Sequence, residues 1–267
     1  MSKSKDVGGR ASIEAKPGLD LKNAVRQLLP RRLGPHRILA GPLRGRRIFT
    51  SWHDYPAAIL GRTEVALINW LRRNVSPGET WLDIGAHYGY TAIAICELVG
   101  PHGRVFAFEP LLATAGYLSL TRDLNAFQQL TIVPFGLDDS TSMRTLQVAT
   151  RRGMATPLEG DVAPHNTIYL TGFEAVWDML ADGDPAIHGV KMDVQGMEIA
   201  ALRGMERWLN RFHPKLVVEI HPGVDRPTFL STVADVGYEP TGMTLDPLPG
   251  ELVPGYIDDR SYVFEAS

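Results

Sequence analysis

A short glycine-containing segment holds the residues best suited to binding a ligand. Gly85 and Gly89 let the backbone turn sharply and approach a ligand closely, because neither carries a Cβ atom. Glu109 stands 20 residues after Gly89, where a carboxylate can accept hydrogen bonds from both hydroxyls of a ribose. The pattern therefore predicts a cofactor site made of Asp83, Gly85, Ala86, His87, Gly89, Thr91 and Glu109.

Two cofactors are bound by loops of this kind. A dinucleotide needs the spacing Gly-x-Gly-x-x-Gly, which places its pyrophosphate at a helix N-terminus. This loop lacks that spacing, since positions 87 and 90 are His87 and Tyr90. Asp83 would repel a pyrophosphate but suits the cationic groups of S-adenosylmethionine (SAM). The segment favours SAM over a dinucleotide, and the alternative without a ligand is an ordinary turn with two glycines.

A second group of residues has the chemistry needed to remove a proton. Methyl transfer is an in-line displacement, so the protein must mainly align the acceptor and take its proton. Asp193 and His221 each follow a strand-like run, and Glu198 falls in the first turn of the next expected helix. We predict these three as catalytic residues, with Asp193 and His221 the best candidates for the base. Their structural alternatives are a helix cap at 193, a helix-dipole partner at 198 and a loop residue at 221.

The surrounding pattern predicts strands and helices that alternate. Such alternation is typical of an α/β fold, with a parallel sheet covered by helices on both faces. Together with the SAM-type loop it predicts a Rossmann-like class I methyltransferase sheet. In that fold, ligands bind at the carboxyl ends of the strands, where both groups of residues lie. The expected strands are 81–84, 104–109, 130–135, 143–148, 167–170, 189–194, 216–220 and 261–264. The expected helices are 64–73, 90–99, 112–124, 173–181, 197–209 and 227–236.

Charge and proline content divide the chain into three parts. We expect a poorly ordered polar tail at 1–20, an irregular N-terminal arm or lid at 21–60, and the SAM-dependent methyltransferase domain at 61–267. The first 50 residues carry 12 Lys or Arg and 3 Asp or Glu, whereas the rest of the chain carries 15 and 27. An acidic body disfavours nucleic acid as the substrate, although the basic segment could contact an anionic partner.

Several protein classes are excluded or disfavoured by what the chain lacks. With Cys96 as the only cysteine, the chain forms no internal disulfide and no cysteine-based zinc site. No apolar run is long enough to span a membrane, and the N-terminus lacks the features of a signal peptide. We therefore expect a cytoplasmic protein, and an oligomeric assembly stays open.

Over residues 60–222 the sequence resembles the FkbM-type methyltransferases, a class I SAM-dependent family. The most specific match is Lys191-x-Asp193-x-x-Gly196-x-Glu198, and further matches are the loop from Leu82 to Thr91, Val105-Phe-Ala-Phe-Glu-Pro110, Leu124-Asn125, Ile132-Val-Pro-Phe-Gly-Leu137, Leu202-Arg-Gly204 and Leu216-Val-Val-Glu-Ile-His221. The resemblance implies O-methylation of sugar hydroxyls on natural products, glycolipids or polysaccharides. It also implies SAM as the cofactor and a small-molecule or glycosylated acceptor.

Two departures from the family pattern concern the acceptor side. Gln195 stands where the family usually has Glu, and Leu170-Thr-Gly-Phe-Glu174 stands where Leu-Asp-Asp is common. Asp193, Glu198 and Glu219 supply oxygen ligands that suit Mg²⁺, whereas the missing acid at 195 argues against a metal. Mg²⁺ is therefore a second option, and its ligands stay unassigned.

The leading prediction is a SAM-dependent O-methyltransferase acting on a hydroxyl of a sugar or secondary metabolite. The chain has no Asn-Pro-Pro-Tyr or Asp-Pro-Pro-Tyr motif, which disfavours N-methylation. Two alternatives remain. One is an RNA or protein methyltransferase that docks through the basic arm, and the other is a non-catalytic SAM-binding subunit.

Overall fold

The computed structural model describes residues 27–148, 155–157, 166–181, 183 and 185–267. The expected tail at 1–20 lies outside these residues. Within the described part of the chain, no helix is long and apolar enough to cross a bilayer.

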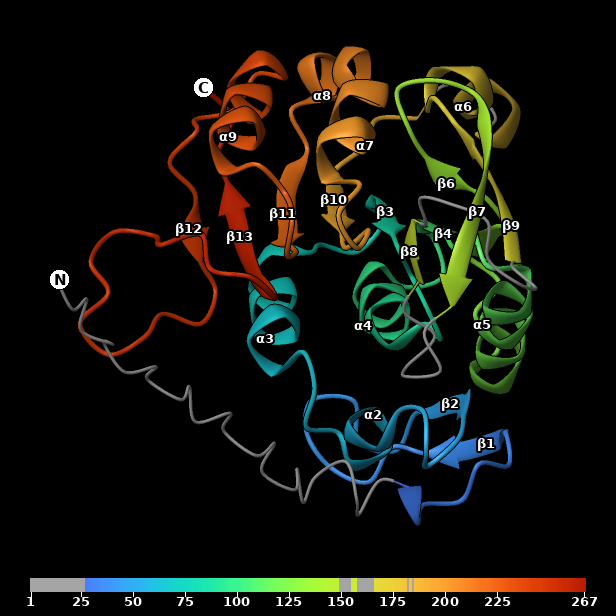
Figure 1. Ribbon diagram of the computed structural model, residues 1–267. Coiled ribbons are helices and arrows are strands. Elements are labelled where there is room, and N and C mark those ends of the chain that lie inside the picture. The colour runs from blue at the N-terminus through green and yellow to red at the C-terminus, as the bar shows by residue number, and fades with distance from the viewer. Residues whose placement is uncertain (1–26, 149–154, 158–165, 182, 184) are drawn as a thin grey trace, which may run out of the picture.

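A seven-stranded sheet forms the centre of the molecule, in the order β12-β13-β11-β10-β3-β4-β5 (Figure 1). Strands β11, β10, β3, β4 and β5 run parallel, and β13 and β12 complete the sheet with antiparallel pairings. Strand order reverses between β3 and β10, so the carboxyl ends of these strands flank a ligand-binding crevice. The bounds are β3 Thr80–Ile84, β4 Arg104–Phe108, β5 Leu130–Val133, β10 Gly189–Met192, β11 Lys215–Ile220, β12 Met243–Thr244 and β13 Arg260–Phe264.

Alternation along each strand divides the apolar core between the two faces of the sheet. Leu82 and Ile84 pack on one face, in the same core cluster as helices α6 to α9, whereas Trp81 packs on the other face, with α3, α4 and α5. This arrangement confirms the α/β class predicted from the sequence. The bounds are α3 Val65–Asn74, α4 Tyr90–Val99, α5 Leu112–Asn125, α6 Glu174–Leu180, α7 Glu198–Gly204, α8 Glu206–Phe212 and α9 Arg226–Asp235.

The expected single helix at 197–209 is two helices, α7 and α8. They meet at Met205, whose ψ of 0° departs from helical geometry. The Gly204 carbonyl accepts a hydrogen bond from the backbone N–H of Phe173 at 3.1 Å. A Cβ atom on Gly204 would lie 2.0 Å from the Asp138 carbonyl oxygen, so the break lets two segments approach closely. Beside it lies a small sheet made of β6 Gly136–Leu137, β9 Asn166–Thr171, β7 Ser142–Val148 and β8 Ala155–Pro157.

The arm is more regular than the sequence indicated, and the expectation of an irregular segment was wrong. Strands β1 Gly34–Arg37 and β2 Arg47–Thr50 form an antiparallel pair, followed by helix α2 Pro56–Leu60. Pro35 lies in β1. Both strands of this two-stranded sheet are edge strands, where a residue without a backbone N–H is tolerated. The backbone N–H of Phe49 donates to Thr121 Oγ1 at 3.0 Å, which fastens β2 to α5.

Candidate active site

A cavity of about 220 Å³ opens at the carboxyl ends of β3, β4 and β10. Five of the predicted cofactor residues line it, namely Gly85, Ala86, His87, Thr91 and Glu109. The other two do not line it: Asp83 is fully buried beneath the loop, and Gly89 is the N-cap of α4. The glycine-containing loop and Glu109, which the sequence predicted as parts of one site, therefore line the same cavity.

The loop between β3 and α4 depends on its two glycines. Gly85 has a φ of 80° and Gly89 a φ of 89°, in the left-handed region that disfavours side chains. A Cβ atom on Gly85 would lie 1.7 Å from the Asp193 carbonyl oxygen, and one on Gly89 would lie 2.4 Å from Leu118. Both positions thus require glycine for conformation and for close packing.

Glu109 connects the loop to the end of β4. Its carboxylate accepts hydrogen bonds from the backbone N–H of His87 at 3.0 Å and from that of Leu111 at 2.9 Å. Burial raises the pKa of Glu109 to about 7, although both hydrogen bonds oppose the rise. The side chain is held rigidly at the cavity wall, where its oxygens can accept further hydrogen bonds from a ligand.

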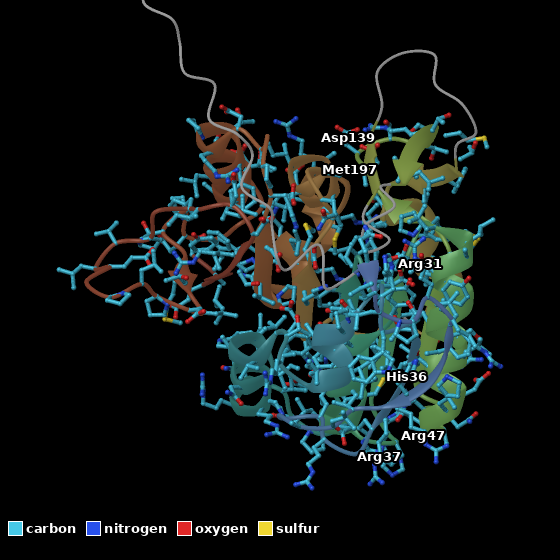
Figure 2. All side chains as sticks on the ribbon, turned by 60° about the horizontal axis from the view of Figure 1, so that its bottom comes forward. Arg31, His36, Arg37, Arg47, Asp139 and Met197 are labelled. Carbon is cyan, nitrogen blue, oxygen red and sulfur yellow. The ribbon has the colours of Figure 1, made fainter. Side chains whose placement is uncertain are left out.

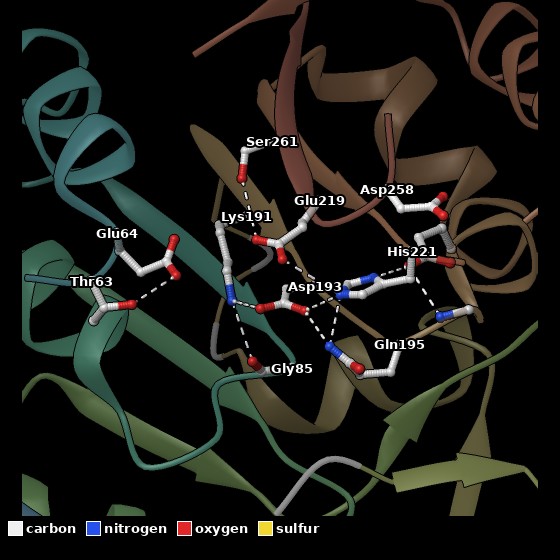
Figure 3. A network of polar contacts seen from close by, with 12 residues as sticks. Thr63, Glu64, Gly85, Lys191, Asp193, Gln195, Glu219, His221, Asp258 and Ser261 are labelled. Carbon is white, nitrogen blue, oxygen red and sulfur yellow. Dashed lines mark hydrogen bonds and ion pairs between the residues drawn. The ribbon is translucent and has the colours of Figure 1, made fainter. Parts of the chain in front are cut away.

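Lys191 links the cofactor loop to the predicted catalytic strand. Its Nζ atom lies 3.2 Å from Asp83 Oδ1. The same atom lies 3.5 Å from Asp193 Oδ2 and donates to the Gly85 carbonyl at 3.2 Å (Figure 3). The lysine side chain is only 7% exposed, so these contacts replace the hydration that burial removes. Asp83 therefore positions the lysine from below the cavity.

The three predicted catalytic residues do come together. His221 Nδ1 lies 2.6 Å from Glu198 Oε1, and its Nε2 lies 3.3 Å from Asp193 Oδ1 and 3.5 Å from Glu219 Oε1 (Figure 3). Gln195, at the position where the sequence departs from the family, has its side-chain amide 2.7 Å from His221 Nε2 and 3.3 Å from Asp193 Oδ1, and its oxygen must face Nε2 when that nitrogen carries a proton. Of the three predicted residues, Asp193 alone lines the cavity, whereas His221 and Glu198 support it from behind.

The charges in this group favour an ionised Asp193 beside a protonated His221. Burial alone would lower the pKa of His221, but hydrogen bonds to Glu198 and Glu219 and the charge of Asp193 raise it to about 10. Burial alone would raise the pKa of Asp193, but Lys191 and His221 hold it below its usual value. These contacts therefore favour the protonated ring of His221.

Asp193, Glu219 and His221, called here the acid–histidine cluster, could also hold a metal ion. One ligand atom from each lies within 4.8 Å of the others. The sequence prediction had placed Glu198 among the oxygen ligands, but that carboxylate faces the opposite nitrogen of His221.

The arm and the segment after it supply part of the cavity wall that the sequence did not reveal. Tyr55, Thr63 and Glu64 line the cavity opposite β10, and Tyr90 lines it from the start of α4. Residues of the arm carry no motif, so nothing in their spacing pointed to the site. The sequence does place Glu64 just before an amphipathic helix, but an acidic residue there is common at the start of helices and does not by itself indicate a site.

The cavity lies where the strand order switches between β3 and β10. Glu109 follows β4, and Lys191 and Asp193 stand at the end of β10. This arrangement is that of the Rossmann-like fold of class I methyltransferases. The family model for the methyltransferase FkbM domain matches residues 83–240, and the chain belongs to that family. No curated protein sequence matches the chain.

Solved structures of related fold are distant. The FkbM methyltransferase of Methylobacillus flagellatus is 17% identical, with a TM-score of 0.48; the match covers 74% of this chain and 50% of that chain, so the protein spans about half the length of this relative. A putative rRNA methylase from Clostridium thermocellum is 14% identical, with a TM-score of 0.46 and coverage of 75% and 93%. Fibrillarin from Aeropyrum pernix, in complex with S-adenosyl-L-methionine, is 15% identical, with a TM-score of 0.47 and coverage of 88% and 89%. These similarities are too distant to indicate a substrate.

Proposed function

We propose that the protein is a SAM-dependent O-methyltransferase that acts on a hydroxyl of a sugar or secondary metabolite. The observation that carries this proposal is the single cavity in which the Gly85–His87 loop and Glu109 lie beside Asp193. A donor-binding loop and a candidate proton acceptor thus face the same space, as a direct transfer between two bound molecules requires.

The residues around the loop fit the donor. Glu109 offers a rigid acceptor for ribose hydroxyls, and Ala86, His87 and Thr91 line the same wall. When bound, SAM supplies a methyl group that its sulfonium already activates, so no metal or covalent intermediate is needed to activate the carbon. The protein has to hold the acceptor oxygen in line and accept its proton.

Asp193 is the residue we assign to receive that proton. A hydroxyl oxygen that gains a methyl group becomes a strong acid, so an ordinary carboxylate is basic enough to accept its proton. Lys191 and His221 keep Asp193 ionised, and its side chain is 25% exposed at the cavity. His221, which the sequence also proposed as a base, acts in this scheme by orienting and charging Asp193, because it is already protonated at neutral pH.

The donor assignment is tested by calorimetry with SAM and S-adenosylhomocysteine, for which we expect saturable binding. The acceptor is found by mass spectrometry of metabolites from cells with and without the gene, as a product that lacks one CH₂ group in the mutant cells. With that acceptor, Asp193→Asn should lose at least about a hundredfold in turnover and keep its affinity for SAM. Near-normal turnover in Asp193→Asn would show that the residue is structural.

A second acceptor class is favoured by the arm. Arg37 and Arg47 are paired across β1 and β2, and both are exposed on the outer side of the arm, as Figure 2 shows; Arg31 is exposed at the start of the arm. Such a surface would suit an anionic macromolecule such as RNA. Binding of RNA that weakens steeply with salt would support this alternative, and methyl turnover with any acceptor would exclude a purely non-catalytic subunit.

A further inference from the structure

Two polar side-chain groups at the arm side of the cavity have one hydrogen-bond partner or none among the described residues. The hydroxyl of Tyr90 is buried with no hydrogen-bond partner among the described residues, although the side chain is only 2% exposed and lines the cavity. A buried hydroxyl without a partner costs about 1–3 kcal/mol, so one at a cavity wall is open to a ligand group that completes it.

Glu64 is the cavity carboxylate with the fewest partners. Asp193 contacts Lys191, Glu219 lies near His221, and Glu109 accepts two backbone hydrogen bonds. Glu64 accepts a single long hydrogen bond, from Thr63 Oγ1 at 3.3 Å, and no described cation lies within ion-pair distance of it. Its side chain is available to bind a positive group.

The side chain of Glu64 does not cap the helix that it precedes. It is the N-cap of α3, but its side chain makes no capping hydrogen bond and its backbone has a left-handed φ of 51°. Figure 3 shows its carboxylate directed from the start of α3 toward the side where Lys191 and Asp193 lie. Its backbone carbonyl accepts the hydrogen bond of Ile68 N–H at 2.9 Å, whereas its side chain contributes an acid to the cavity.

We propose that Glu64 and Tyr90 bind the amino-acid end of the methyl donor, with Glu64 accepting hydrogen bonds from its α-ammonium group and the Tyr90 hydroxyl donating to its α-carboxylate. One unpaired acceptor and one unpaired donor on the same wall match the two charges of a zwitterion. The proposal rests on the proposed donor, and it places a donor-binding residue outside the segment 83–240 that the family model matches.

The electrostatics of the wall agree with a cationic occupant. Burial raises the pKa of Glu64 to about 7, and the nearby charge of Glu219 adds to this rise. An ammonium group beside the carboxylate favours its ionised form and lowers that pKa. Binding of the donor at pH 7 should therefore release protons from Glu64.

The test compares ligands that differ only in the amino-acid end. S-adenosylhomocysteine carries it, whereas 5′-methylthioadenosine has the same adenosine and sulfur without it. In calorimetry, Glu64→Gln and Tyr90→Phe should each lower the affinity for S-adenosylhomocysteine at least tenfold. The affinity for 5′-methylthioadenosine should stay within about twofold of that of the wild type. Tyr88→Phe, a buried tyrosine of the same loop that does not line the cavity, and Glu174→Gln, on α6, are the matched controls and should change neither affinity.

A second readout separates binding from a structural role. Calorimetry at pH 7 in phosphate and in Tris, which differ in ionisation enthalpy, gives the number of protons released. The wild type should release protons when it binds S-adenosylhomocysteine but not when it binds 5′-methylthioadenosine. Glu64→Gln should release none with either ligand. Equal losses for both ligands, or unchanged affinity for S-adenosylhomocysteine, would overturn the proposal. A wild type that binds neither ligand nor SAM would instead overturn the donor assignment.

Discussion

The protonated state of His221 makes the stability of the fold depend on pH. Its pKa rises from 6.5 in the unfolded chain to about 10 in the folded protein, with burial opposing the rise and the contacts to Glu198 and Glu219 outweighing it. Because the folded protein binds this proton more tightly, the stabilisation is complete below pH 6.5 and is lost as the pH rises through 10. At about 1.4 kcal/mol per unit, the full effect is at most about 5 kcal/mol.

The measurement is the free energy of unfolding in urea between pH 8 and 10, for the wild type and for His221→Gln. The wild type should lose about 2 kcal/mol more than the variant over this interval, since each pH unit below the folded pKa removes about 1.4 kcal/mol. The difference between the two proteins cancels other groups, such as the buried thiol of Cys96, whose burial raises its pKa. His102→Gln, at an exposed histidine, is the control and should follow the wild type.

Nitrogen NMR of histidine-labelled protein gives an independent answer if His221→Gln does not fold. Both ring nitrogens of His221 should carry protons at pH 8. A neutral ring at that pH, or equal slopes for the wild type and His221→Gln, would refute the reasoning.

Three further predictions concern the cavity. Gly85→Ala should abolish folding or donor binding, because its Cβ atom would lie 1.7 Å from the Asp193 carbonyl oxygen; Gly78→Ala, at a similar φ of 85° with no atom within 4 Å, should cost only about 1 kcal/mol in urea unfolding. Similar losses in the two variants would contradict this. Glu109→Ala should weaken the binding of S-adenosylhomocysteine by about 1–3 kcal/mol in calorimetry, and unchanged affinity would disprove the ribose contact. Mg²⁺ should not raise the melting temperature, because Gln195 already contacts His221 Nε2 at 2.7 Å; a rise that grows with Mg²⁺ concentration would establish a metal at the acid–histidine cluster.

The sheet and the helices on it were predictable because their apolar periodicity is local. The predicted helix at 90–99 matches α4 at both ends, since Gly89 and Gly100 bound a mainly apolar run. The single helix predicted at 197–209 was wrong, because its break depends on Phe173, a residue remote in sequence that bonds the Gly204 carbonyl. Local periodicity carries no information about such a contact.

The candidate site divides in the same way. The glycine loop and Glu109 could be found because their spacing follows from the geometry of one strand–helix–strand unit. Tyr55 and Glu64 could not, because their place at the cavity depends on how the arm packs on the sheet. The charge of His221 also required the structure, since it results from carboxylates that meet only in three dimensions.

The contribution of the arm to the cavity has a consequence for how such a protein can diversify. Glu109 and Asp193 are fixed by strands of the buried sheet, whose pairing tolerates few changes. Tyr55 lies on a segment whose β1–β2 pair is fastened to α5 by a few hydrogen bonds. Exchanging this segment would reshape one wall of the cavity, whereas Glu109 and Asp193 would keep their places at the ends of their strands. The shape of this wall and the acids at the strand ends are in this way encoded by separate stretches of the chain.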